Sequence, residues 1–166
     1  MADEREAEGR QPPKQETEQE TEQGAETPSR RGYALDAQIG YLLRRAQQRH
    51  LSIFHTHMAE GLTSQQFAVL AKLSEVGEIS QNALGRQTSM DQSTINGVVQ
   101  RMVKRELVSK KKSATDARMI TLELTREGRR VLARVLPLAA EITQLTLAPL
   151  SDKDQARLLK LLRKIC

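Results

Sequence analysis

The clearest pattern of apolar and polar positions lies between residues 91 and 105. Apolar residues recur there at steps of three and four, which predicts an amphipathic helix with one buried stripe: Ile95, Val98, Val99 and Met102. Asp91 is placed to cap its first turn. The opposite face carries short neutral hydrogen-bonding groups instead of long charges: Gln92, Ser93, Asn96, Gly97 and Gln100. Such groups can bond base edges or phosphates, although this stretch taken alone favours a solvated helix with a polar front.

Two helices are predicted before a glycine break at Gly77. A three- or four-residue step of apolar and histidine positions predicts a long first helix over residues 35–60, and Gly61 ends it. Residues 63–66, Thr-Ser-Gln-Gln, have the pattern of a capping box and start a second helix that reaches about Leu73.

The next residues predict a helix-turn-helix. Residues 78–80 form a very short strand, and Ser80 caps a third helix over residues 81–87. Residues 88–90 are then a short turn into the amphipathic helix. Two short helices joined in this way are a helix-turn-helix, whose second helix enters the major groove of DNA.

After Glu106 the apolar period changes from about 3.6 to two. Residues 107–112 and 119–124 therefore predict two strands joined by a short polar loop, which is a wing following the helix-turn-helix. A fifth helix begins after Thr125, and a last helix follows Ser151. The predicted fold class is mainly α with a small β-wing.

Charge is unevenly distributed along the chain. Residues 1–29 carry a net charge of −6 and residues 30–166 a net charge of +11, so the overall value of +5 hides a strongly basic body. A basic body is typical of a protein that binds a polyanion, although charge alone leaves a merely soluble basic protein equally open. Residues 1–32 hold almost nothing apolar and are expected to be a disordered acidic and polar tail.

The cysteine content and the hydropathy of the chain indicate the cellular compartment. The single cysteine, Cys166, excludes an intramolecular disulfide, and no apolar run is long enough for a membrane span or a signal peptide. We therefore expect a cytoplasmic protein with no membrane partner.

The chain resembles the MarR family of bacterial winged-helix regulators over about residues 35–166. The wing carries Asp116-Ala-Arg118, then Leu122-Glu-Leu-Thr125 and Gly128, and the amphipathic helix opens with Asp91-x-Ser-Thr94. Glu106 stands where the family usually has glycine. The resemblance implies a homodimer in which residues 62–125 form the DNA-binding winged helix and residues 33–61 and 126–166 form the dimerisation helices.

The motifs and the resemblance together assign candidate DNA contacts. They lie on the amphipathic helix, the turn before it and the wing: Ser89, Asp91, Gln92, Ser93, Thr94, Asn96, Gln100, Arg101, Lys112, Asp116 and Arg118. By the resemblance, Arg118 enters the minor groove and Asp116 orients its guanidinium. A surface ion pair of little energetic value is the alternative for Asp116 and Arg118, and a solvated strand edge is the alternative for the lysine run 110–112.

The resemblance also implies an effector, a small aromatic carboxylate or its acyl-CoA thioester, bound between the dimer layer and the winged helix. The chain offers cations, hydrogen-bond donors and apolar walls there: Arg45, Arg49, His50, Ile53, Phe54, His57, Gln66 and Phe67. The alternative for the histidines is an ordinary core or dimer-interface role.

Other classes of function find little support in the sequence. The chain has no P-loop, HExxH, CxxC or Gly-x-Ser-x-Gly motif, so we expect no enzyme, no cofactor and no metal. His50 and His57 are about 10 Å apart along a straight helix, too far to share one ion. The predicted function is a ligand-responsive repressor that binds double-stranded operator DNA as a homodimer. The alternative is a constitutive or architectural DNA-binding protein without an effector.

Overall fold

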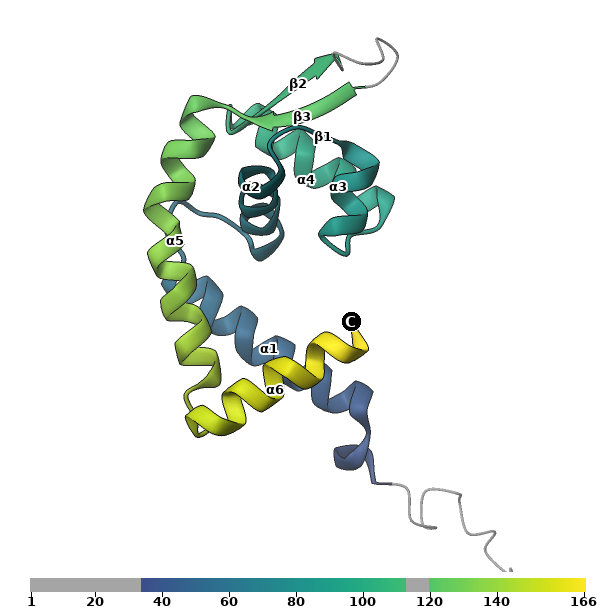
Figure 1. The fold of residues 1–166 in the computed structure, drawn as a ribbon, viewed down its shortest axis with the longest axis vertical. Coiled ribbons are helices and arrows are strands. Elements are labelled where there is room, and N and C mark those ends of the chain that lie inside the picture. The colour runs from purple at the N-terminus through teal and green to yellow at the C-terminus, as the bar shows by residue number, and fades with distance from the viewer. Residues whose placement is uncertain (1–33, 113–119) are drawn as a thin grey trace, which may run out of the picture. The chain divides into compact units, whose positions relative to one another are not determined.

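The computed structural model describes residues 34–112 and 120–166 of the 166-residue chain (Figure 1). The chain divides into two units, residues 1–36 and 37–166, and only residues 34–36 of the first are described. The predicted disordered tail and the wing-tip residues Asp116 and Arg118 lie outside the described residues.

The first helix, α1 (Ile39–His57), is shorter at both ends than the sequence predicted. A separate 3-10 turn occupies Leu35–Ala37, and Gln38 adopts an extended backbone before α1 begins. At the other end Met58 is extended, and Glu60 and Gly61 both adopt left-handed backbone angles, with φ of 61° and 57°. Extended and left-handed residues cannot continue an α-helix, so the chain turns here.

The next two helices begin and end at the predicted signals. At the start of α2 (Ser64–Val76) the Thr63 hydroxyl accepts from the backbone N–H of Gln66. The Gln66 side-chain oxygen accepts from the backbone N–H of Thr63, which completes the capping box. Gly77 follows with φ of 74°. Ser80 then caps α3 (Gln81–Gln87) by accepting from the Ala83 amide.

The amphipathic helix α4 (Gln92–Lys104) buries the stripe that its spacing predicted. Ile95, Val98, Val99 and Met102 have no exposed surface. They pack into one hydrophobic core with residues of α2, of the strands and of α5. The tight contact of α3 with α4 depends on Gly85, because a Cβ there would lie 3.3 Å from the Ile95 Cγ2 atom and 3.2 Å from the Met90 carbonyl oxygen.

Three antiparallel strands form the wing sheet in the order β1-β3-β2. The long pair, β2 (Val108–Lys112) and β3 (Ile120–Leu124), matches the predicted hairpin, with Val108 opposite Leu124 and Lys112 opposite Ile120. The two-residue strand β1 (Ile79–Ser80) pairs with the other edge of β3.

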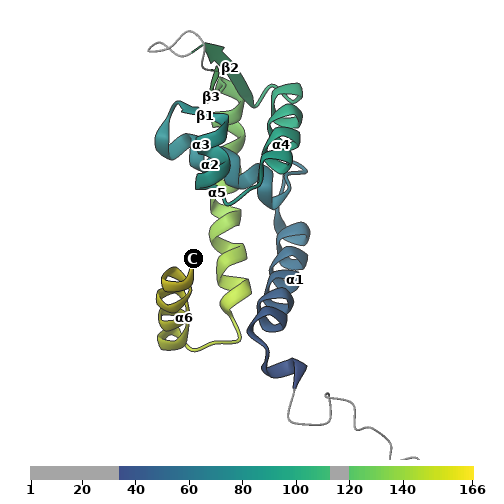
Figure 2. The same cartoon turned by 90° about the vertical axis from the view of Figure 1, so that its right-hand side faces the viewer.

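Two helices complete the unit, α5 (Arg126–Leu147) and α6 (Asp152–Ile165). Helix α1 packs along α5, while α6 leaves the end of α5 at a bend of 104° and buries none of its residues (Figure 2). Within the described ranges, no single helix is long and apolar enough to cross a membrane; only the bent α5–α6 pair meets that test, by length and composition.

The start of α5 is fixed by a close backbone approach at Gly128. The Thr125 hydroxyl caps the helix on the Gly128 amide and donates to the Glu106 carbonyl oxygen, which brings the first turn of α5 onto the end of α4. A Cβ at Gly128 would lie 2.0 Å from the Leu107 carbonyl oxygen, so only glycine fits there without a backbone shift.

We therefore predict that Gly128→Ala destabilises the fold by more than about 2 kcal/mol, because backbone atoms must move to accept the methyl group. Thermal unfolding followed by circular dichroism should give a midpoint lower by about 5 °C or more. The matched control is Gly40→Ala in α1, where an added Cβ meets nothing within 4 Å. Helix propensity predicts an unchanged or slightly higher midpoint for the control. Equal midpoints for wild type and Gly128→Ala would contradict the packing described here.

Candidate nucleic-acid interface and adjoining cavity

The face of α4 opposite the core presents the polar residues that the sequence singled out. Gln92, Ser93, Gln100 and Arg101 are exposed, and Thr94 and Asn96 are half-buried. Arg101 lies over Gly97, with its Nη1 atom 3.3 Å from where a Cβ of that glycine would be. The face is therefore accessible along its whole length and is bordered by a cation at its carboxyl-terminal end.

Asp91 holds the first turn of α4 together. Its Oδ1 atom accepts from the Thr94 amide at 2.8 Å and from the Ser93 hydroxyl at 2.7 Å, and its Oδ2 atom accepts from the Thr94 hydroxyl at 2.7 Å. These bonds, the Thr94 amide first, hold the pKa of Asp91 far below its ordinary value, so the carboxylate stays ionised. Since the hydroxyl protons of Ser93 and Thr94 already point at Asp91, these side chains offer lone pairs to a ligand in this arrangement.

A cluster of three amide side chains lies on the same face, and one of them comes from α3. The Asn96 Oδ1 atom accepts from the Gln92 Nε2 atom at 3.0 Å and also from the Gln81 Nε2 atom. The sequence predicted Gln92 and Asn96 as DNA contacts but not Gln81. Gln81 stands one residue after the helix cap Ser80, and that position does not reveal a partner fifteen residues away.

The predicted basic residues of the wing are exposed. Lys110, Lys111 and Lys112 lie on β2, and the Lys111 Nζ atom pairs with the Glu123 Oε1 atom at 2.6 Å. The hydrogen bond from Lys111 lowers the pKa of Glu123. Lys110 and Lys112 flank this pair. At the turn before α4, Ser89 is exposed and has a left-handed backbone, with φ of 53°.

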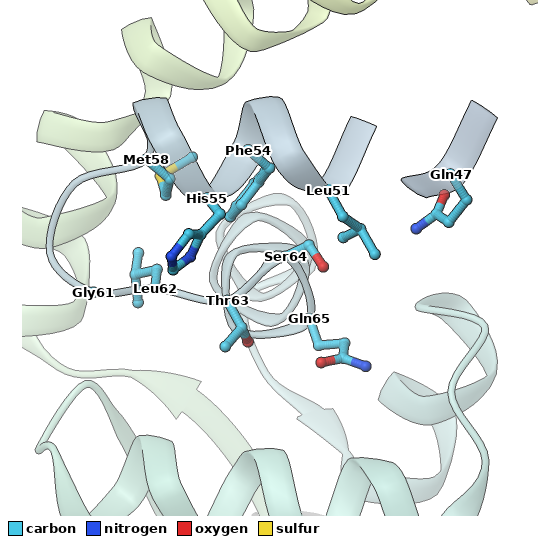
Figure 3. A pocket seen from close by; sticks show the side chains of 10 residues that line it. All are labelled: Gln47, Leu51, Phe54, His55, Met58, Gly61, Leu62, Thr63, Ser64 and Gln65. Carbon is cyan, nitrogen blue, oxygen red and sulfur yellow. The ribbon is translucent and has the colours of Figure 1, made fainter. Parts of the chain in front are cut away.

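A cavity of about 530 Å³ lies between α1 and the start of α2 (Figure 3). Apolar and polar side chains of α1 line one side, and the connection to α2 lines the other: Gln47, Leu51, Phe54, His55, Met58, Gly61, Leu62, Thr63, Ser64 and Gln65. His55 is the sole ionisable side chain among these lining residues. A volume between about 300 and 1,000 Å³ with apolar walls and a few polar groups is typical of a small-molecule site.

The structure places most of the predicted effector residues away from this cavity. Arg49 donates to the Leu145 carbonyl oxygen at 3.1 Å, and the His50 Nδ1 atom is 3.1 Å from the Thr146 hydroxyl. His57 lies 3.9 Å from Glu141. All three therefore face α5, whereas the cavity opens on the neighbouring side of α1.

Of the remaining predicted residues, Phe54 alone is among the residues that line the cavity. Phe54 is buried and lines it, and its ring packs against Phe67 at 6.2 Å between centroids. Gln66 is buried by its capping role, Ile53 packs against the core, and Arg45 lies over the Tyr41 ring at 5.7 Å.

The cavity residues on α1 form a second stripe, beside the predicted stripe that carries His50 and His57. Gln47, Leu51 and His55 follow each other at steps of four, which is the same helical spacing as the predicted stripe. The sequence could not choose between the stripes because α1 contacts α5 along one side and the cavity along the other. The spacing of this second stripe is the signal that could have identified it.

The wall of the cavity is hydrogen-bonded to the carboxyl-terminal end of α4 and shares a hollow with its amino-terminal end. Arg105, which caps the carboxyl-terminal end of α4, donates from Nη2 to the Glu60 carbonyl oxygen at 2.6 Å and from Nη1 to the Gly61 carbonyl oxygen at 3.4 Å. Ser64 and Gln65 also line a second hollow, of about 330 Å³, together with Asp91 and Thr94. Gly61 to Gln65 thus line the cavity, Glu60 and Gly61 bond Arg105 at the carboxyl-terminal end of α4, and Ser64 and Gln65 share the second hollow with Asp91 and Thr94 at its amino-terminal end.

In the described part of the chain, no group of three or more histidine, cysteine, aspartate or glutamate side chains is arranged to hold a metal ion.

Comparison with known proteins identifies the fold and the family. A model of the MarR family matches residues 60–119. The HTH-type transcriptional repressor NicR of Pseudomonas putida is 39% identical over 134 residues, which are 80% of this chain and 85% of that protein.

Two crystal structures are similar as well. A probable transcriptional regulator from Pseudomonas aeruginosa is 42% identical, with a TM-score of 0.78 over 80% of this chain and all of that one. BpsR of Bordetella bronchiseptica, whose DNA binding is regulated by 6-hydroxynicotinic acid, is 36% identical, with a TM-score of 0.77 over 80% of this chain and 96% of that one. The chain belongs to the MarR family of winged-helix transcriptional regulators.

Proposed function

We propose that the chain is a ligand-responsive repressor, which binds operator DNA through α4 and the wing and releases it when a small aromatic acid enters the cavity between α1 and α2. The observation that carries this proposal is the position of the cavity wall, because Gly61 in that wall bonds Arg105 at one end of α4, and Ser64 and Gln65 share a second hollow with Asp91 and Thr94 at the other end. A ligand at this wall can change the placement of α4 without touching DNA.

The DNA-binding part of the proposal rests on charge and on side-chain chemistry. The body carries a net charge of +11, and α4 exposes amides, hydroxyls and Arg101 on one face. Amides and guanidinium groups form hydrogen bonds with base edges, while lysines of β2 suit phosphates. The roles assigned to Asp116 and Arg118 at the wing tip stay predictions, as do those of Ser89 and Lys112.

We further propose a homodimer, because apolar residues of α1 and α6 are left uncovered by the rest of the described chain. In α1, Ile39 is 64% exposed; in α6, Leu161 is 49% and Ile165 is 66% exposed. An amphipathic helix that buries none of its residues within its own chain is expected to bury its apolar side against a partner. A second copy of the chain would supply the same helices around a two-fold axis.

The chemistry of the cavity favours a free aromatic acid. Leu51, Phe54 and Met58 offer apolar surface to a ring, and His55 in its protonated form can pair with a carboxylate. Gln47 and Gln65 can bond a ring hydroxyl or a ring nitrogen. An acyl-CoA thioester carries a long polar arm that would have to extend outside the cavity. The regulation of the related BpsR by 6-hydroxynicotinic acid supports the same class of ligand.

The proposed release mechanism uses the position of the cavity wall next to both ends of α4. A ring wedged between α1 and Ser64 or Gln65 pushes on the start of α2, which borders Asp91 and Thr94 at the amino-terminal end of α4. The same displacement moves the Gly61 carbonyl group that Arg105 holds at the other end. Two recognition helices of a dimer must fit successive major grooves at once, so a small tilt of each lowers the affinity for DNA.

Binding to DNA is tested by footprinting on the DNA upstream of the chain's own coding sequence. We predict protection of two half-sites about 10 bp apart, because two copies of α4 must enter successive turns of one face of the duplex. Light scattering at the same protein concentration should give twice the mass of the chain. Protection of a single half-site, or a monomer at concentrations that saturate the DNA, would contradict the proposed dimeric mode.

The effector site is tested with 6-hydroxynicotinic acid and two variants on the same helix. We predict that His55→Ala weakens acid binding by about tenfold or more in titration calorimetry, because a charge-assisted hydrogen bond is lost. His50→Ala, which faces α5, should keep wild-type affinity for the acid. Both variants should bind operator DNA normally when no acid is present.

Three other outcomes decide between the remaining possibilities. Loss of acid binding in His50→Ala alone would place the site on the side of α1 that carries His50 and His57, the two histidines that the sequence predicted as ligands. Normal binding in both variants would exclude His50 and His55 as ligands of the acid. A wild-type protein that binds none of a panel of hydroxylated aromatic acids, yet binds its operator, would favour a constitutive DNA-binding protein.

A further inference from the structure

The amide cluster on the polar face of α4 limits which bases Asn96 can recognise. Asparagine reads adenine with two hydrogen bonds, in which its Oδ1 atom accepts from adenine N6 and its Nδ2 atom donates to adenine N7. Here the Asn96 Oδ1 atom already accepts from two amide groups, one from Gln92 and one from Gln81. A carbonyl oxygen has two lone pairs, so both are in use. Only the Nδ2 atom of Asn96, a donor, is available to DNA.

The cluster is held in place by rigid packing. Gln81 and Asn96 are both half-buried, and they lie on helices that meet at Gly85. At that position the Ile95 side chain approaches α3 too closely for a larger residue to fit without adjustment. Gln92 lies one helical turn before Asn96 on the same face. The orientation of the Asn96 amide is therefore set before DNA binds, and Gln81 sets it from outside α4.

We propose that Gln81 is a specificity-determining residue that acts through Asn96, by presenting its Nδ2 donors to a base edge that carries acceptors. Guanine offers two acceptors in the major groove, O6 and N7, and thymine offers O4. Cytosine places only an amino donor at the corresponding edge, and adenine places one beside its single acceptor, N7, so both face the Asn96 donors less favourably than guanine does. This inference rests on the proposed function, since it concerns how α4 reads DNA.

The cluster predicts which base is preferred at the position that Asn96 contacts, and how variants of Gln81 change that base. In Gln81→Glu a carboxylate replaces the donor, so the Asn96 amide turns over to donate to it and presents Oδ1 outward. The preferred base at that one position then changes from guanine or thymine to cytosine or adenine. Gln81→Ala frees one lone pair of Oδ1, so the Asn96 amide can present either its oxygen or its nitrogen to DNA, and the preference there relaxes by about tenfold.

The experiment selects bound duplexes from a library of random sequence with the full-length protein and sequences them. Wild type, Gln81→Ala, Gln81→Glu, Asn96→Ala and the double variant Gln81→Ala with Asn96→Ala are compared. Gln87→Ala is the matched control, because Gln87 is an exposed glutamine at the other end of α3. Gln81→Ala and Asn96→Ala should alter the same base pair, and the double variant should add little to Asn96→Ala. Gln87→Ala should leave that base pair unchanged.

The outcomes separate this inference from the proposed function. If the wild type selects a defined sequence and the Gln81 variants select the same one, or lower binding to all sequences equally, the role of Gln81 is refuted. The same conclusion follows if Gln81→Ala and Asn96→Ala alter different base pairs. If the wild type selects no sequence at all, the proposed operator binding is wrong, and this inference fails with it.

Discussion

The arrangement of this molecule depends on the short connection between α1 and α2. Glu60 and Gly61 turn the chain with left-handed backbone angles, and each has its carbonyl oxygen held by Arg105 at the end of α4. The Glu60 carboxylate also pairs with Arg134 of α5 at 3.0 Å, and the capping box of Thr63 and Gln66 fixes the next turn. A left-handed glutamate is unfavourable by itself, so this conformation persists because partners from two other helices hold it.

That connection gives the cavity its functional meaning. A pocket along an isolated helix would have no consequence for DNA, whereas the wall of this one bonds Arg105 at the end of α4 and shares a second hollow with Asp91 and Thr94 at its start. A ligand shifts an equilibrium only by its difference in affinity between the two states. We propose that the difference arises because a ring in the cavity displaces residues that bond the end of α4.

The sequence predicted the elements whose signals are local. Asp91, Ser80 and Thr63 cap the helices that their spacing indicated, and the buried stripe of α4 is the predicted one. Features that depend on tertiary contacts were not predictable. The cavity between α1 and α2 was not predicted because its residues on α1 follow the same helical period as the side that carries His50 and His57, and Gln81 was missed because its partner Asn96 comes from another helix. The roles of Asp116 and Arg118 rest on the family resemblance alone.

The central claim is that the aromatic acid and operator DNA oppose each other through one protein. The most direct measurement is the affinity of 6-hydroxynicotinic acid for the free protein and for the protein saturated with operator DNA, by titration calorimetry. We predict weaker acid binding to the DNA complex, by the same factor by which the acid weakens DNA binding, since coupling between two sites is reciprocal. Equal affinity of the acid for both forms would contradict it.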